Sequence, residues 1–199
     1  METDFKIAVL MLAAGASRRM NGIKQILAFK DSTLLENALK TAKMSENDQV
    51  FCVLGANKEE IQQKVDFQDI EIIENTAWSD GLGKSIAVGV EAIQNYKDYD
   101  LILVMLGDQP FISSVYLDKM ISKFKENQSY IIATSYSGKP GVPALFPKKI
   151  FSELIKLSGD SGAKVILQHH ENIIKLEAEN TFDVDSPEDY KKVCGEVQG

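Results

Sequence analysis

The sequence is poor in arginine, cysteine and histidine. Only two of its 22 basic residues are arginines, Arg18 and Arg19, and they are adjacent in one segment rich in glycine and alanine. Guanidinium groups for bidentate recognition of phosphate or carboxylate are therefore confined to that segment. The two cysteines, Cys52 and Cys194, lack the spacing of metal ligands, and two scattered cysteines are typical of a reducing compartment.

The chain also lacks a long apolar run and an excess of positive charge. Its longest apolar stretch, residues 7–16, is about half of the ~20 residues that span a bilayer. Acidic residues precede this stretch and arginines follow it, which does not fit a signal peptide. With 22 Lys+Arg against 29 Asp+Glu, the net charge of -7 disfavours nucleic-acid binding, which depends on basic residues. We therefore expect a cytoplasmic protein with no membrane or nucleic-acid partner.

What the sequence does contain is an alternation of short apolar runs with longer helical patterns. This alternation is typical of βαβ units. We therefore expect one α/β domain over residues 1–199, with a Rossmann-like fold whose mainly parallel sheet is flanked by helices. The expected strands cover residues 7–12, 50–54, 70–73, 101–106, 130–134 and 173–176, and the expected helices include 83–94, 115–126, 149–157 and 163–169.

Capping residues mark three helix starts. Thr33 and Asn57 are each followed three residues later by glutamate, which predicts two capping boxes. Ser186 stands before a proline and two acids, and this order predicts the start of the last helix.

Five segments are predicted to be neither strand nor helix. In an open parallel sheet, ligands bind beyond the carboxyl ends of the strands. We therefore expect the functional residues in these segments, which are 13–24, 74–85, 107–112, 136–146 and 182–186.

The first of these segments combines small residues with positive charge. Small residues allow the backbone to approach a ligand closely, and successive N–H groups can form a nest for an anion. Arg18, Arg19 and Lys24 add cationic side chains to the same segment. The alternative is an ordinary loop with solvated arginines, but the full pattern favours phosphate binding.

The second segment ends in Gly83-Lys84-Ser85, which is similar to the end of a P-loop. A P-loop requires glycine five residues before Gly83, where this chain has Trp78, so we set that interpretation aside. Gly81 and Gly83 open the predicted helix and Ser85 lies in its first turn, so these residues still suit contact with a base, sugar or phosphate.

Two aspartates stand out, and one of them is a candidate metal ligand. Asp108 follows a wholly apolar strand, a position that presents a carboxylate to a hard metal ion. Asp185 lies just ahead of the last predicted helix. The alternatives are a polar turn at Asp108 and helix capping near Asp185. His169 and His170 are adjacent, so their side chains point apart and metal binding there is not expected.

Together and in this order, the segments resemble the MobA/MocA-like nucleotidyltransferases, which attach a nucleotide to molybdopterin. The resemblance runs from about residue 9 to 190. Leu-Ala-Ala-Gly at 12–15, Asp-Gln-Pro at 108–110 and the tryptophan segment are similar to the MocA branch, which uses CTP, whereas MobA uses GTP. Asn21, followed by Gly22, stands where the family usually has glycine. The other segments that carry the resemblance are 75–81, 141–146, 159–164 and 183–189.

The resemblance implies roles for individual residues. Arg18, Lys24 and Asp108 are the implied catalytic residues, because nucleotidyl transfer requires positioning and charge neutralisation with little acid–base chemistry. Residues 136–146 and 159–164 are implied to form the pterin side of the cleft. The implied nucleotide-binding residues are Leu12, Ala13, Ala14, Gly15, Arg18, Lys24, Asp80, Gly81 and Ser85, and the implied ligands of a Mg²⁺ cofactor are Asp108 and Asp185.

The implied activity is transfer of CMP from CTP to the terminal phosphate of molybdopterin. Three alternatives remain open: a GTP-dependent guanylyltransferase, a nucleotidyltransferase that acts on another small phosphate, and a carrier that delivers the molybdenum cofactor to a hydroxylase. Whether Arg19 contacts a ligand also remains open.

Overall fold

The computed structural model describes residues 4–20 and 22–197. Asn21, at which the sequence departs from the family pattern, lies outside the described residues. The strands are β1 (Ile7–Leu12), β2 (Ala28–Phe29), β3 (Ser32–Thr33), β4 (Gln49–Leu54), β5 (Ile70–Glu74), β6 (Leu101–Leu106), β7 (Ile131–Tyr136), β8 (Lys139–Pro147) and β9 (Ile173–Glu177). The helices are α1 (Leu34–Met44), α2 (Lys58–Lys64), α3 (Leu82–Tyr96), α4 (Ser114–Glu126), α5 (Phe151–Leu154), α6 (Lys164–His169) and α7 (Pro187–Val197).

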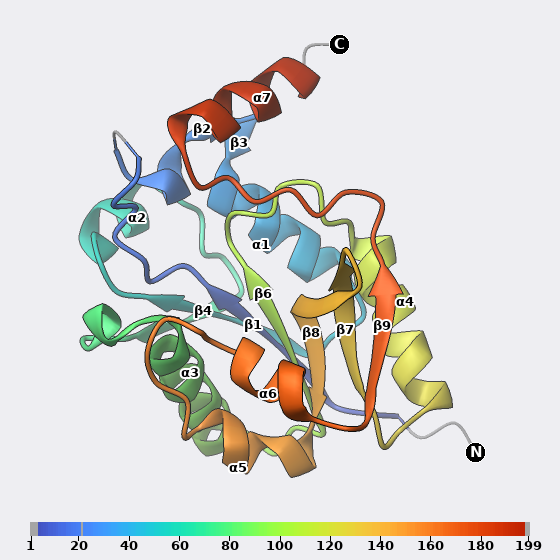
Figure 1. The fold of residues 1–199 in the computed structure, drawn as a ribbon. Helices are drawn as coiled ribbons and strands as arrows, with labels where there is room; N and C mark the ends of the chain where they lie inside the picture. The colour runs from blue at the N-terminus through green and yellow to red at the C-terminus, as the bar shows by residue number, and fades with distance from the viewer. Residues whose placement is uncertain (1–3, 21, 198–199) are drawn as a thin grey trace.

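The main sheet is parallel except for one strand. Its order is β5-β4-β1-β6-β8-β7-β9, and β8 is antiparallel to both of its neighbours while the other pairs are parallel. Helices cover both faces of this sheet (Figure 1). The predicted α/β class is therefore confirmed, and the six predicted strands are all present with ends within two residues of the prediction.

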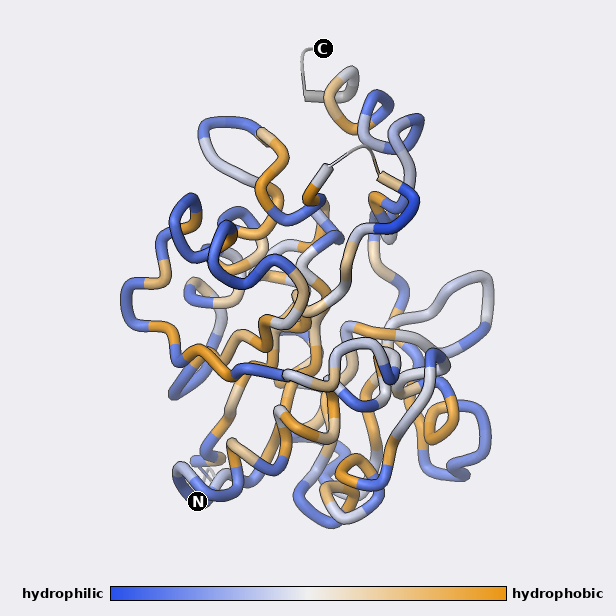
Figure 2. The backbone as a smooth tube through the Cα atoms, turned by 90° about the vertical axis from the view of Figure 1, so that its left-hand side faces the viewer, coloured by the Kyte–Doolittle hydropathy of each residue, from blue (hydrophilic) through white to orange (hydrophobic). Residues whose placement is uncertain are grey.

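Each face of the sheet packs against its own set of helices. Successive side chains of a strand point to opposite faces. In β1, Val9 and Met11 join the core that contains α1 and α4, whereas Ala8 and Leu10 join the core that contains α3, α5 and α6. Figure 2 shows hydrophobic segments gathered in the interior and hydrophilic ones toward the periphery. The buried central strands thus give a firm base to the loops at their carboxyl ends.

The expectation of a loop over residues 136–146 is wrong. Most of this segment is β8, which lies inside the sheet, and its residues 144–146 are fully buried between β6 and β7. Prolines argue against a central strand because they cannot donate to the ladder. Here the register with β7 shifts between Ala133 and Thr134 and leaves Pro143 without a ladder partner, so the strand tolerates it.

Two of the three predicted helix caps are present. Thr33 accepts a hydrogen bond from the backbone of Glu36, whose side chain accepts one in return, so the capping box is confirmed. Ser186 caps α7 by accepting from the backbone of Asp189. Asn57 makes no capping bond, because its backbone is left-handed with φ 56°, so the second capping box is wrong.

The remaining helices agree with the prediction in place but not always in length. The helix expected over 149–157 is a 3₁₀ turn followed by the short α5. Within residues 4–20 and 22–197, none of the helices combines the length and apolar character needed to cross a bilayer.

The last helix closes the structure beyond the carboxyl ends of the strands. In Figure 1, α7 lies beside the β2–β3 hairpin, away from the main sheet. A small apolar cluster joins them, with Phe29 and Leu34 on one side and Val184 and Val193 on the other. The Tyr190 hydroxyl also donates to the carbonyl of Ala28 at 2.7 Å. This docking holds the 182–186 segment next to the first loop.

Candidate active site

A cleft of about 540 Å³ opens at the carboxyl ends of β1 and β6. Four of the five segments expected to carry function contribute to its wall, whereas residues 136–146 contribute none because they form β8. The predicted residues that line the cleft are Leu12, Ala13, Ala14, Gly15, Arg18, Lys24, Gly81, Ser85, Asp108 and Asp185. Asp80, the remaining predicted residue, is not among those that line it.

Gln25 fixes the shape of the first loop. Its side-chain amide donates to the carbonyls of Ala13 and Gly15 at 2.9 Å each, and its Oε1 accepts from the Ser17 hydroxyl at 3.1 Å. Ser17 Oγ also accepts from the backbone N–H of Lys24 at 3.0 Å. Sequence reasoning assigned no role to Gln25, and the only signal was its place directly after Lys24. Its 5% exposure shows that it supports the loop from below.

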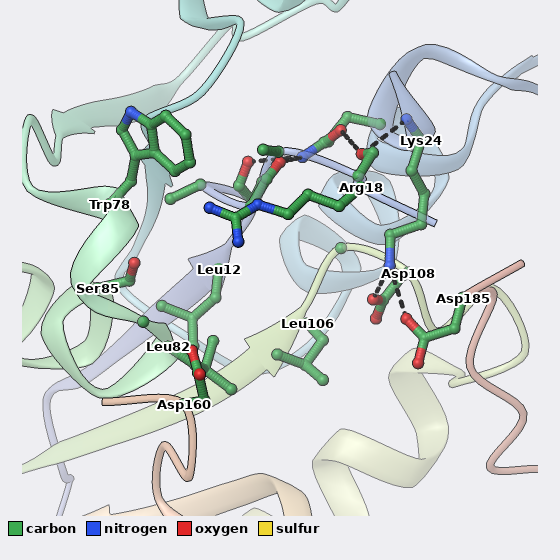
Figure 3. Close-up of a pocket in the computed structure, with 18 of the residues that line it drawn as sticks. Leu12, Arg18, Lys24, Trp78, Leu82, Ser85, Leu106, Asp108, Asp160 and Asp185 are labelled. Carbon is green, nitrogen blue, oxygen red and sulfur yellow. Dashed lines mark hydrogen bonds and ion pairs between the residues drawn. The ribbon is translucent and has the colours of Figure 1, made fainter. Parts of the chain in front are cut away.

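One end of the cleft is built from charged side chains. We call Arg19, Lys24, Asp108 and Asp185 the carboxylate end. Lys24 Nζ lies 2.5 Å from Asp108 Oδ2 and 3.1 Å from Asp185 Oδ1, and Arg19 lies 3.2 Å from Asp185 Oδ2. Burial alone would lower the pKa of Lys24, but the two carboxylates outweigh burial and raise this pKa. Figure 3 shows Lys24 pointing at both aspartates.

A hydrogen-bond network beside the carboxylate end reaches the hairpin formed by β7 and β8. The Gln109 amide donates to Asp183 Oδ1 at 2.9 Å and to the Tyr136 hydroxyl at 2.6 Å, and Tyr136 donates to the carbonyl of Val142. Burial, reinforced by the neighbouring Asp108 carboxylate, raises the pKa of Asp183 to about 6 despite the bond from Gln109. Sequence reasoning gave Gln109 and Asp183 no role of their own, since their partners lie far away in the sequence.

The two aspartates fit a hard divalent cation. Asp108 Oδ1 is buried and has no hydrogen-bond partner in the structure, so one of its lone pairs is available to a ligand. The backbone N–H of Val184 donates to the carbonyl of Asp108 at 3.0 Å, which keeps Asp185 near Asp108. Within the described ranges, no three His, Cys, Asp or Glu side chains gather closely enough to hold a metal. Mg²⁺ uses few carboxylates together with phosphate oxygens, so two aspartates could hold it only when a phosphate supplies further ligands.

Arg18 extends away from the carboxylate end. In Figure 3 its guanidinium reaches across the cleft toward Trp78 and Ser85. It takes part in no ion pair among the described residues, in contrast to Arg19 and Lys24. Its exposed charge is therefore available to an anion in the cleft.

The opposite end of the cleft is less charged. We call Trp78, Gly81, Leu82 and Ser85 the tryptophan end. Ser85 is 3% exposed and accepts a hydrogen bond at 3.0 Å from Asn75, whose own exposure is 1%. The first turns of α3 are thereby held in place below the indole ring.

Glycine allows a second loop to pack closely at the tryptophan end. A Cβ on Gly83 would lie 2.6 Å from the carbonyl oxygen of Ser158, and one on Gly81 would lie 2.4 Å from Gly159. The N–H of Gly83 donates to the Gly159 carbonyl at 2.8 Å, and the N–H of Gly159 donates to the Asp80 carbonyl at 2.9 Å. Asp80 therefore contributes to this packing through its backbone, and it is not among the residues that line the cleft.

The segment expected on the pterin side is only partly at the cleft. Asp160 and Lys164 line it, so residues 159–164 reach the cleft, whereas residues 136–146 do not. In Figure 3, Asp160 lies below Leu82 and far from Lys24.

Comparison with known proteins identifies the family. The model of the MobA-like NTP transferase domain matches residues 9–173. The chain is 30% identical over 183 residues to the nicotine blue oxidoreductase of Paenarthrobacter nicotinovorans, with 88% of each chain covered. It is 25% identical over 187 residues to the molybdenum cofactor cytidylyltransferase of Escherichia coli K12, with 92% of this chain and 93% of that protein covered.

A solved structure has the same fold. It is the Mycobacterium tuberculosis Rv0371c homologue from Mycobacterium sp. strain JC1, with a TM-score of 0.80, 28% identity, and coverage of 96% of this chain and 97% of that one. The resemblance drawn from the sequence is thus confirmed. The chain belongs to the MobA-like NTP transferase family and has the fold and cleft of a nucleotidyltransferase.

Proposed function

We propose that this nucleotidyltransferase transfers CMP from CTP to the terminal phosphate of molybdopterin, in a Mg²⁺-dependent reaction that releases pyrophosphate. One observation carries the chemistry: Asp108 and Asp185 converge on Lys24 at one end of a nucleotide-sized cleft, while the unpaired Arg18 extends toward the other end. Carboxylates for a metal and cations for a polyphosphate are what transfer between phosphates requires.

The reaction is an in-line displacement at the α-phosphorus of the nucleotide. An oxygen of the acceptor phosphate forms a bond to this phosphorus while the bond to the β-phosphate oxygen breaks, and its electron pair leaves with pyrophosphate. Arg18 and Lys24 would neutralise the charge that develops on the leaving group. The backbone of residues 12–15 would hold the nucleotide, because these residues line the cleft and a Cβ on Gly15 would meet nothing within 4 Å among the described residues.

Asp108 and Asp185 would hold the magnesium ion. When bound, Mg²⁺ supplies positive charge to the phosphate oxygens at the reacting phosphorus. The free Oδ1 of Asp108 supports this assignment. Trp78, Gly81 and Ser85 would then lie by the nucleoside, and Asp160 and Lys164 by the acceptor.

The choice of CTP and molybdopterin rests on two likenesses. The segments at 12–15 and 108–110 resemble the MocA branch, and the chain is 25% identical to a protein named molybdenum cofactor cytidylyltransferase. A test incubates the protein with Mg²⁺ and molybdopterin and each of the four nucleoside triphosphates, and measures pyrophosphate. We expect release with CTP. Release of pyrophosphate with GTP alone would assign a guanylyltransferase. Release only when another small phosphate replaces molybdopterin would change the acceptor. No release with any combination of triphosphate and acceptor would refute the proposal.

A redox reaction is the second candidate, because the relative at 30% identity is named an oxidoreductase. Oxidation or reduction of nicotine blue with an added redox partner, without pyrophosphate release from any triphosphate, would favour it. Asp108→Ala distinguishes an enzyme from a carrier of the molybdenum cofactor. This substitution abolishes turnover in an enzyme, whereas delivery of the cofactor to a molybdenum hydroxylase would survive it.

A further inference from the structure

The carboxylate end balances its own charges when no ligand is bound. The two carboxylates of Asp108 and Asp185 face two cations, Lys24 and Arg19, and both cations come from the same short loop. Lys24 donates to both aspartates, and Arg19 contacts the second oxygen of Asp185. A free metal ion that approaches these carboxylates therefore meets positive charge that is already there.

Lys24 cannot be displaced into water easily. Its side chain is 15% exposed and that of Asp108 is 18% exposed, so the ion pair is largely desolvated. An ammonium group that loses both carboxylates while it stays buried would carry an unpaired charge, which is strongly unfavourable. Arg19 differs, because its side chain is 73% exposed and can return to solvent at little cost. Lys24 is therefore the main obstacle to a free metal ion.

A polyphosphate provides what the free metal ion lacks. Its oxygens would offer Lys24 and Arg19 new partners in the cleft, which both cations line together with residues 12–15. The phosphates also supply the oxygen ligands that two carboxylates leave missing. The cations can thus change partners without being left unpaired.

We propose that the ligand of this cleft is the metal–nucleotide complex and not the free ion, because Lys24 occupies the metal-binding carboxylates until a triphosphate draws it away. This inference rests on the proposed function, from which it takes the metal and the triphosphate. Metal and nucleotide must then strengthen each other's binding by the same factor, because coupling between two bound ligands is reciprocal.

The test measures Mn²⁺ binding directly, by the electron paramagnetic resonance signal of the free ion. We compare wild type, Lys24→Met and Asp108→Asn, each with and without CTP and without acceptor. Lys119→Met is the matched control, because it removes one positive charge from an exposed position of α4 outside the cleft. Near-ultraviolet circular dichroism checks that each variant is folded.

Without nucleotide, we expect Lys24→Met to bind Mn²⁺ about tenfold more tightly than wild type, because the competing charge is gone. Lys119→Met should match wild type, and Asp108→Asn should bind weakly in every condition. CTP should strengthen binding strongly in wild type and much less in Lys24→Met. Equal or weaker nucleotide-free binding by folded Lys24→Met would overturn the inference, as would tight Mn²⁺ binding by wild type without CTP.

Failure of the proposed function has a different signature. If no triphosphate gives pyrophosphate but Lys24→Met still binds Mn²⁺ more tightly than wild type, the inference that Lys24 competes with the metal stands and the reaction assignment fails. If pyrophosphate is released but Lys24→Met shows no gain in Mn²⁺ binding, the reaction assignment stands and the inference about Lys24 fails.

Discussion

The two ends of the cleft are built in different ways. At the carboxylate end, charged side chains contact one another across 84 and 161 positions of sequence, as Lys24 does with Asp108 and Asp185. At the tryptophan end, backbone groups of Gly83 and Gly159 bond to each other and glycine permits the close approach. One end is held by charge and the other by shape.

Because of this difference, the two ends should respond differently to a bound ligand and to a substitution. Ion pairs between side chains can exchange partners when a charged ligand arrives, because the groups stay charged and mobile. At Gly83, an added Cβ would lie 2.6 Å from the carbonyl oxygen of Ser158, so a side chain fits there only if the backbone moves. Substitutions at the carboxylate end should therefore affect turnover first, and those at the tryptophan end should affect stability or nucleotide affinity first.

The largest effect is expected from Asp108→Ala at the carboxylate end. Loss of a metal-binding carboxylate beside the reacting phosphates should lower kcat by about 10³-fold or more. Steady-state pyrophosphate release at saturating CTP measures this. Glu126→Ala, at the exposed end of α4, is the control and should retain full kcat. A kcat for Asp108→Ala within tenfold of wild type would show that charge at this end is not what drives turnover.

The next effect is expected from Gly83→Ala at the tryptophan end. The new methyl group would collide with Ser158, whose backbone nitrogen and oxygen lie 2.7 and 2.6 Å from its position, so the 158–160 loop or α3 must move. We expect a loss of about 2 kcal/mol in the free energy of unfolding, measured by urea denaturation.

Gly15→Ala is the matched control for that substitution. A Cβ there meets nothing within 4 Å, so the free energy of unfolding should stay within about 0.5 kcal/mol of wild type. The same variant should weaken nucleotide binding if the backbone of residues 12–15 holds the nucleotide. Equal stability of the two variants would remove the distinction between a packed end and an open loop.

A smaller effect is expected from Trp78→Ala. The indole lines the cleft, and the Trp78 side chain lies against Gly55. A Cβ added to Gly55 would be 2.6 Å from the Cβ of Trp78. Removing this aromatic surface should raise KM for the nucleotide about tenfold and leave kcat within about threefold, because the ring binds the ground state and transition state alike. Initial rates over a range of nucleotide concentrations separate the two constants. A fall in kcat with unchanged KM would place Trp78 in the chemistry and contradict the division between the ends.

The two ends also differ in how far the sequence could predict them. Asp108 was predicted because it follows a wholly apolar strand, and strand ends meet at one edge of a parallel sheet. Asp185 stands just ahead of a helix start, and its role was predicted from the family resemblance. The glycines at 81 and 83 were predicted as ligand contacts, yet Gly83 is needed for packing against Ser158. A close backbone approach depends on a partner 75 residues away, which no local pattern contains.

Strand β8 shows that the same limit applies to the prediction of the fold. The parallel strands were predicted from short apolar runs, three of them apolar throughout, whereas β8 contains three prolines and a glycine. Only its position between β6 and β7 explains how those residues are accommodated. The network from Gln109 to Asp183 and Tyr136 was missed for a related reason, because it exists only once β8 lies inside the sheet.

The smallest expected effect tests Asp183, which lies beside the carboxylate end, through pH. Burial and the neighbouring Asp108 raise the pKa of Asp183 from 3.8 to about 6 in the folded protein, so the folded state holds this proton more tightly than the unfolded chain does. The resulting stabilisation is fully present below about pH 4 and is lost as the pH rises through about 6.

Asp183→Asn removes this ionisation but keeps an oxygen that can accept from Gln109. In metal-free buffer, the free energy of unfolding of the variant relative to wild type should therefore rise by about 1 kcal/mol between about pH 4 and pH 7, a figure reduced for the partial exposure of the group. Urea denaturation at a series of pH values measures the difference. Parallel curves for the two proteins would mean that Asp183 ionises as it does in water. The negative charge of Asp183 would then have no energetic cost beside the carboxylate end, and the contrast in charge with the tryptophan end would rest on the ion pairs of Lys24 and Arg19 alone.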